Sequence, residues 1–167
     1  WVEANRETVD KFAVFPTGYL GLLTPSKGLE LYDGDIRLKS RTGEELEVFS
    51  AQNYLDYIAE HVEPWSYLKF PYYKKLGFPE GAYRVGPLGR LNMVEHIETP
   101  MANEELKVFK AINDGAPVEN TLYYHYARMI EALFAAERVR VLLDDPDILS
   151  NDILNTHQEP TGHGVGV

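Results

Sequence analysis

The sequence predicts an α+β fold in which a small antiparallel β-meander is followed by packed α-helices. Short segments in the first third alternate apolar and polar residues, and turn residues separate them. Further along, apolar residues recur at helical spacing, above all over about 120–143. The length of 167 residues and the 44% hydrophobic, 25% charged composition suit one globular domain with its own core.

The β-meander is expected within residues 11–50. Dense, β-prone apolar residues from Lys11 to Leu23 indicate one or two strands. Three further segments alternate apolar and polar residues: LELY at 29–32, IRLKS at 36–40 and LEVFS at 46–50. Asp33-Gly34, between the first two, is typical of a hairpin turn. These segments predict a sheet with one buried face.

Helices are expected over most of residues 51–150. Ser50 is a candidate N-cap for a short helix over 51–61, and Thr99-Pro100 is a typical helix start. The longest helix is predicted over about 120–143 and ends before Asp145-Pro146.

The whole chain, 1–167, is expected to be a single internal segment of a longer subunit. Trp1 stands where an initiator Met would, and the chain stops in an apolar, glycine-punctuated run. Residues 151–167 are predicted to form an extended tail.

The segment YRVGPLGRLN at 83–92 places two cations, Arg84 and Arg90, around glycines and a proline. Gly86 frees the backbone and Pro87 restricts it. We therefore expect an ordered but irregular connection that presents both arginines in fixed directions, so that it either binds or braces something.

A polar stripe interrupts the apolar face of the predicted long helix. Tyr124, His125, Arg128 and Glu131 lie three or four residues apart and share one side of the helix. One interpretation is a solvated face with an ordinary Arg128–Glu131 pair. The other is that Glu131 is buried and accepts a charge-assisted hydrogen bond from Arg84 or Arg90.

Composition excludes several kinds of chemistry. The net charge of −10 and the lack of a basic cluster argue against nucleic acid or anionic lipid as a partner. No apolar run approaches the ~20 residues that a membrane span needs, so we expect a cytoplasmic protein with no membrane insertion. The chain has no cysteine, and its five histidines lack metal-ligand spacing. We therefore predict no catalytic, metal-binding or cofactor-binding residue.

Several ordered blocks resemble the central part of the large, nickel-bearing subunit of nickel–iron hydrogenases. The resemblance is closest to the soluble bidirectional, NAD-reducing group and runs from about Tyr32 to Val167. The blocks are EPWSYLKFPYYKKLGFPEGAYRVGPLGRLN at 63–92, TPMANEEL at 99–106, NTLYYHYARMIEALFAAE at 120–137, DPDILS at 145–150 and the terminal GVGV.

The resemblance implies a parent enzyme that reversibly oxidises H2 at a nickel–iron centre carrying CO and cyanide. Electrons would pass through iron–sulfur clusters to a flavin-containing diaphorase that reduces NAD. The implied partners are the remainder of the large subunit, the small subunit and the diaphorase subunits. The family's nickel-binding cysteines fall outside this chain, so the segment should hold no cofactor and be inactive alone. The residues implied as scaffold near the active site are Arg84, Gly86, Pro87, Arg90, His125, Arg128 and Glu131.

Two alternatives remain open. The chain resembles, less closely, a related quinone-reducing respiratory subunit that shares the fold and lacks the cysteines. It is also compatible with a non-catalytic interaction module, given its acidic composition and missing thiols. Electron acceptors other than NAD, such as ferredoxin or a deazaflavin, remain open as well.

Overall fold

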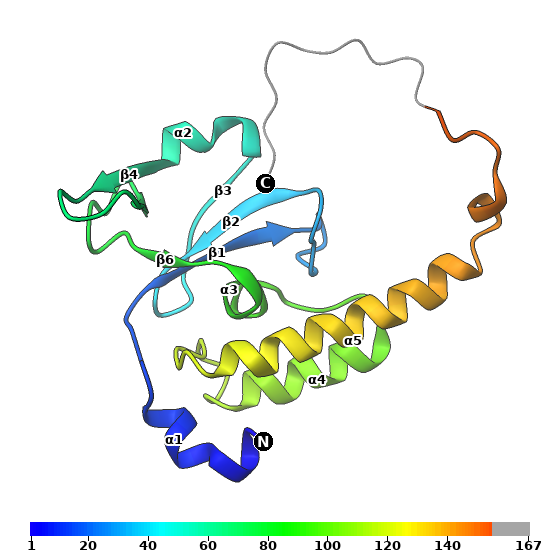
Figure 1. Cartoon of the computed structure of the whole chain (residues 1–167), viewed down its shortest axis with the longest axis horizontal. Helices are drawn as coiled ribbons and strands as arrows, with labels where there is room; N and C mark the ends of the chain where they lie inside the picture. Colours follow the sequence, from blue (N-terminus) through cyan, green and yellow to red (C-terminus); the bar gives the residue numbers. More distant parts are fainter. Residues whose placement is uncertain (155–167) are drawn as a thin grey trace.

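The protein consists of a small β-sheet covered on one side by helices, with a two-stranded ribbon beside it (Figure 1). This computed structural model describes residues 1–154. The described helices are α1 (Arg6–Lys11), α2 (Tyr54–Tyr57), α3 (Gly86–Met93), α4 (Pro100–Ala111) and α5 (Tyr123–Leu143), with short 3-10 turns η1 (Glu3–Asn5), η2 (Ala51–Asn53) and η3 (Pro146–Leu149). The strands are β1 (Gly18–Leu23), β2 (Asp35–Lys39), β3 (Glu45–Phe49), β4 (Ile58–Val62), β5 (Lys69–Tyr73) and β6 (Tyr83–Arg84). The predicted α+β class, with its meander and one long helix, is confirmed.

The main sheet has the order β3-β2-β1-β6, in which β1, β2 and β3 are antiparallel and β6 runs parallel to β1. The segment LELY, expected to be a strand, forms only a single bridge from Leu29 to Leu23. The reason is local, because the Glu30 carboxylate accepts hydrogen bonds from the N–H groups of Leu31 and Tyr32, at 2.8 and 2.9 Å. That side-chain turn competes with a strand ladder, and β2 pairs with β1 instead.

The two faces of β1 belong to two different apolar clusters, as the alternation of a strand requires. Leu22 packs with Ile36 and Phe49 in a small cluster. Leu23 joins the main core, which lies between the sheet and the helices and includes Leu88 of α3.

The prediction of a helix over 51–61 is wrong for the second half of that range. Helical structure ends at Tyr57, and β4 follows at once and pairs with β5 in register from Ile58↔Tyr73 to Val62↔Lys69. Cross-strand contacts favour the ribbon over a longer helix, among them a 2.7 Å ion pair between Lys69 and Glu60.

The prediction of an irregular connection over 83–92 is also wrong, because α3 occupies most of this segment. Pro87 lies in the first helical turn, where its missing N–H is no disadvantage. Gly89 is needed for close packing, since a Cβ there would lie 2.7 Å from the carbonyl oxygen of Arg84. Glycine and proline thus serve a helix packed tightly against a strand.

Helix α4 begins as predicted, with Thr99 preceding Pro100. The Thr99 side chain makes no capping hydrogen bond. Instead, the Glu137 carboxylate of α5 accepts from the N–H groups of Met101 and Ala102, at 3.0 and 2.9 Å. Helix α5 lies alongside α4 (Figure 1). The Glu137 carboxylate of α5 therefore caps the start of α4.

Most of the predicted extended tail, residues 155–167, lies outside the described residues. Within the described part, none of the helices has the length and apolar character required to cross a bilayer.

Candidate functional site: the seam between two helices

The centre of the site is an ion pair that joins α3 to α5. Arg90 donates two hydrogen bonds to Glu131, from Nε to Oε1 at 2.6 Å and from Nη2 to Oε2 at 2.9 Å. The side chains of Arg90 and Glu131 are only 26% and 10% exposed. Such a bidentate guanidinium–carboxylate pair fixes both distance and orientation. We call the contact formed by Val85, Gly86, Arg90, Tyr124 and Glu131 the α3–α5 seam. The prediction that Glu131 is buried and paired is confirmed, with Arg90 as its partner.

The start of α3 is held by a second contact of the seam. The Tyr124 hydroxyl donates to the carbonyl oxygen of Val85 at 2.9 Å. Gly86 has a φ of +73°, which favours glycine, and a Cβ there would lie 3.7 Å from the Tyr124 ring. Burial raises the pKa of Tyr124, although the nearby Arg84 and Arg90 lower it. Tyr124 therefore remains a protonated donor near neutral pH.

The opposite side of Arg90 lies against β1. A Cβ at Gly21 would be 3.1 Å from Cγ of Arg90. The absent side chain at Gly21 thus leaves room for the arginine between sheet and helix.

Three cations contact the carbonyl groups at the other end of α3. Arg37 Nη1, Lys39 Nζ and Lys110 Nζ donate to the carbonyl oxygens of Met93, Asn92 and Val94, at 3.0, 3.5 and 2.5 Å respectively. The C-terminal end of a helix carries partial negative charge, so these contacts are favourable. Burial lowers the pKa of Lys39 to about 8 and also lowers that of Lys110.

Sequence reasoning missed these three cations. They come from β2 and α4, far from α3 along the chain, and no local spacing connects them with it. Only the alternation that placed residues 36–40 in a strand could have indicated that Arg37 and Lys39 share one face.

Arg84 does not take part in the pair with Glu131. It lies on β6, is buried, and donates a long 3.5 Å hydrogen bond from Nη2 to the carbonyl oxygen of Phe15. Its guanidinium carbon lies 5.7 Å from the centre of the Phe15 ring. The two arginines of the segment therefore have different surroundings.

The predicted polar stripe of α5 is divided. Tyr124 and Glu131 face α3, whereas His125 and Arg128 are exposed. Among the described residues, Arg128 forms no ion pair with Glu131. His125 lines a pocket of about 690 Å³ between the N-terminal segment, α4 and α5.

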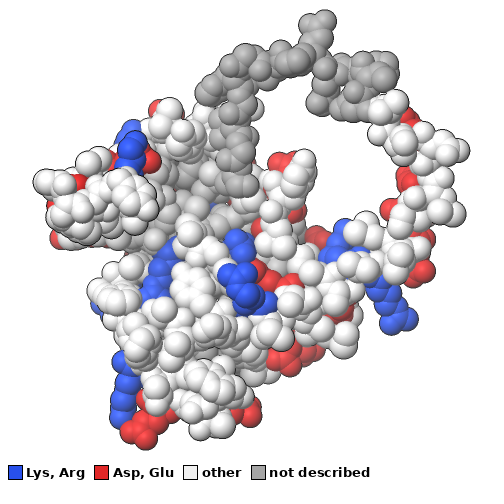
Figure 2. All heavy atoms as spheres, in the orientation of Figure 1, with Lys and Arg blue, Asp and Glu red and all other residues white. Residues whose placement is uncertain are grey.

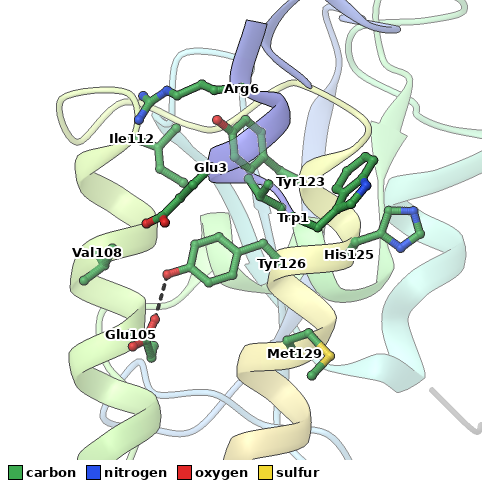
Figure 3. A pocket seen from close by; sticks show the side chains of 11 residues that line it. Trp1, Glu3, Arg6, Glu105, Val108, Ile112, Tyr123, His125, Tyr126 and Met129 are labelled. Atoms are coloured by element: carbon green, nitrogen blue, oxygen red, sulfur yellow. Dashed lines mark hydrogen bonds between the residues drawn. The ribbon is translucent and has the colours of Figure 1, made fainter. Parts of the chain in front are cut away.

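Figure 3 shows His125 beside Trp1, while Tyr126 points across the pocket to Glu105. The hydroxyl of Tyr126 donates to the Glu105 carboxylate at 2.7 Å. In the part of the chain that the structure describes, no three His, Asp or Glu side chains come together as a metal site.

Basic side chains gather near the centre of the face drawn in Figure 2, next to acidic ones. This interspersed pattern differs from the continuous basic surface of a nucleic-acid-binding protein.

Comparison with known proteins finds relatives among hydrogenase subunits, although no family model matches the chain. A vhu subunit of the F420-non-reducing hydrogenase of Methanocaldococcus jannaschii is 44% identical over 165 residues, covering 99% of this chain and 39% of that protein. The beta subunit of the NAD-reducing hydrogenase HoxS of Cupriavidus necator is 40% identical over 167 residues, covering 99% of this chain and 34% of that protein.

A third relative is named as an iron-sulfur subunit of the F420-non-reducing hydrogenase of Archaeoglobus profundus; it is 40% identical over 169 residues, covering 96% of this chain and 34% of that protein. Among solved structures, an NAD+-reducing NiFe hydrogenase in the H2-reduced state superposes with a TM-score of 0.83 at 36% identity. That match covers 88% of this chain and 33% of the other chain. The chain spans little more than a third of the length of the curated relatives it matches.

The comparisons correct the subunit that was inferred from the sequence blocks. One of these relatives is named as an iron-sulfur subunit, and none is named as a nickel-bearing large subunit. The identities do not single out the NAD-reducing group either, since an F420-non-reducing relative is 44% identical and the NAD-reducing one 40%. The blocks carry no metal ligand, so they could not separate one kind of subunit or group from another.

The expectation that the segment has no cofactor is corrected as well. The name of the Archaeoglobus profundus relative associates an iron–sulfur cofactor with this kind of subunit. Iron–sulfur clusters are held by cysteine thiolates, and this chain has no cysteine. The residues of this chain therefore do not fit as cluster ligands. Over nearly its whole length, the chain is homologous to part of a hydrogenase subunit.

Proposed function

We propose that this chain is a scaffold segment of a hydrogenase subunit, within a protein that reversibly oxidises H2. The observation that carries the proposal is the match of 99% of the chain to subunits of two kinds of hydrogenase, at 44% and 40% identity. The fold supports it, because the TM-score of 0.83 is to a hydrogenase chain.

The α3–α5 seam supports the scaffold role. Its polar groups are used in contacts within the chain: each oxygen of the Glu131 carboxylate accepts a hydrogen bond from Arg90, and the Tyr124 hydroxyl donates to the carbonyl oxygen of Val85. Contacts of this kind fix the position of the backbone around them. The chain would thus hold α3 in a fixed orientation, while redox groups are bound elsewhere in the enzyme.

We propose that electrons from H2 reach a soluble acceptor through iron–sulfur clusters and further subunits of the same complex. The relatives divide into F420-non-reducing and NAD-reducing hydrogenases by name. NAD is the acceptor we propose for this protein, and an acceptor other than NAD is the alternative.

Deleting the gene that encodes this chain tests the proposal. Extracts of the deletion strain should lose H2-dependent reduction of both benzyl viologen, which accepts electrons directly from hydrogenases, and NAD. Complementation should restore both activities. Unchanged H2-dependent viologen reduction in the deletion strain would contradict a hydrogenase role. If the deletion strain loses viologen reduction but extracts of the wild type show no H2-dependent NAD reduction, the hydrogenase role stands and NAD is rejected as the acceptor.

A further inference from the structure

Arg84 is a buried cation without an anionic partner among the described residues. Its side chain lies on β6, and the residue is only 8% exposed. Within the described part of the chain, its Nη1 makes no hydrogen bond and its Nη2 makes only the long one to Phe15. The ring of Phe15, whose centre lies 5.7 Å from the guanidinium carbon, offers a cation–π contact. A buried charge normally needs a paired charge as well.

Two other polar groups that lack a partner among the described residues lie near Arg84 along the chain fold: Tyr19 on the neighbouring strand β1, and Thr17 directly before that strand. Tyr19 is the partner of Arg84 in the parallel pairing of β1 with β6, so both side chains point to the same side. Thr17 precedes Tyr19 by two residues and lies directly before the start of β1. Tyr19 Oη and Thr17 Oγ1 are buried and, like Arg84 Nη1, have no hydrogen-bond partner within residues 1–154.

All three groups can donate hydrogen bonds. The guanidinium has donors only, and the two hydroxyl groups can donate as well as accept. Tyr19 stays protonated at neutral pH, because burial raises its pKa to about 12. Donors near a positive charge are complementary to an oxyanion, and a planar carboxylate matches the geometry of a guanidinium group.

We propose that Arg84, Tyr19 and Thr17 form a binding site for a carboxylate group. Thr17 also lines a pocket of about 600 Å³ at the end of the sheet, together with Gly18 and Arg41. The carboxylate is either a small free anion or an Asp or Glu side chain from protein outside this chain.

The first test measures thermal unfolding of the chain in sodium formate and in sodium chloride at matched ionic strength. Formate should raise the midpoint in a saturable way beyond the effect of chloride. In Arg84→Met the apparent formate affinity should fall at least tenfold, and in Tyr19→Phe several-fold. Arg128→Met, which removes an exposed arginine, is the matched control and should bind formate as the wild type does. Equal effects of formate and chloride, or unchanged formate binding in Arg84→Met, would overturn the proposal.

Because Arg84→Met could change stability by itself, a second measurement follows the Arg84 guanidinium directly. Nitrogen NMR resonances of this side chain should shift on formate addition in the wild type and stay fixed on chloride addition. Fixed resonances with both salts would again overturn the proposal.

Repeating the formate titration in the intact hydrogenase complex distinguishes the two sources. If formate no longer binds there, a protein carboxylate occupies the site; if it still binds, the ligand is a small anion. Both results support a carboxylate site. A failure of this inference would leave the proposed hydrogenase role unaffected, since that role rests on homology.

Discussion

The two halves of α5 differ in the interactions that stabilise them. The first half, 123–134, contains the buried residues Tyr123, Ala127, Ile130 and Glu131, and no residue after Glu131 in this helix is buried. In the second half, Val139, Val141, Leu142 and Leu143 are 48–66% exposed. Figure 1 shows this second half extending beyond α4 and the sheet.

One continuous helix therefore has two sources of stability. Packing against α3 and α4 stabilises the first half, and this is the usual source of helix stability in proteins. The second half depends more on helix-forming residues, such as Ala135, Ala136 and Arg138. Among the described residues, the second half forms hydrogen bonds with a neighbouring helix only through Glu137, which accepts from the start of α4.

The largest expected effect comes from truncating an apolar side chain in each half. Ile130→Ala should lower the free energy of unfolding by about 2–5 kcal/mol, because it leaves a cavity in the main core. Leu142→Ala should change it by less than about 0.5 kcal/mol, as an exposed position allows. Urea unfolding of both variants measures the difference. Similar losses at the two positions would remove the distinction between the halves.

The seam itself should give the next largest effect. Glu131→Gln should lower the free energy of unfolding by about 2–4 kcal/mol, because it leaves the guanidinium of Arg90 half-buried without its counter-charge. The control Arg128→Met removes an exposed charge on the same helix and should have little effect. Combining Arg90→Met with Glu131→Leu should destabilise less than either charge removal alone, and strictly additive losses in this cycle would argue against a coupled pair.

A pair of glycine and alanine exchanges separates packing from helix propensity. Gly89→Ala should destabilise by about 1–3 kcal/mol, although alanine is the better helix former, because its Cβ would overlap the carbonyl oxygen of Arg84. Ala136→Gly, at an exposed site in the second half, should cost about 1 kcal/mol through propensity alone. A stabilising Gly89→Ala would show that α3 does not pack as closely on β6 as the structure has it.

The smallest effect should depend on pH. Burial raises the pKa of Glu137, but the hydrogen bonds from the N–H groups of Met101 and Ala102 outweigh it and hold the pKa below its usual value of 4.5. A carboxyl with a depressed pKa contributes stability above its unfolded pKa, and this contribution is lost as the pH falls through the folded pKa. The stability difference between wild type and Glu137→Gln should therefore be present at pH 6 and shrink below about pH 4. A difference that stays constant over this range would rule out the carboxylate cap.

Elements with strong local signals could be predicted from the sequence. Thr99-Pro100 marked the start of α4, the apolar periodicity over 120–143 marked α5, and alternation marked β2 and β3. Helix α3 was missed because its glycine and proline serve tertiary packing, which local rules interpret as irregular structure. Strand β4 was missed because the ribbon depends on pairing with β5.

The candidate site could be predicted in part for the same reason. The spacing on α5 singled out Glu131, and the arginines of 83–92 offered two possible partners, of which the structure has Arg90. The cations at the end of α3 come from distant elements, so the sequence gives no local indication of them. His125 and Arg128 share helical spacing with Glu131, yet they are exposed because α3 covers only one edge of the stripe.

Amide hydrogen exchange along α5 tests the central claim most directly, since it reports the opening free energy of each half of the helix. We predict slow exchange for amides from Ala127 to Phe134 and much faster exchange from Val139 to Leu143. In Glu131→Gln, protection should fall in the first half and remain unchanged in the second. Uniform protection along the helix, or no loss of protection in Glu131→Gln, would contradict the claim that the α3–α5 seam holds this helix in place.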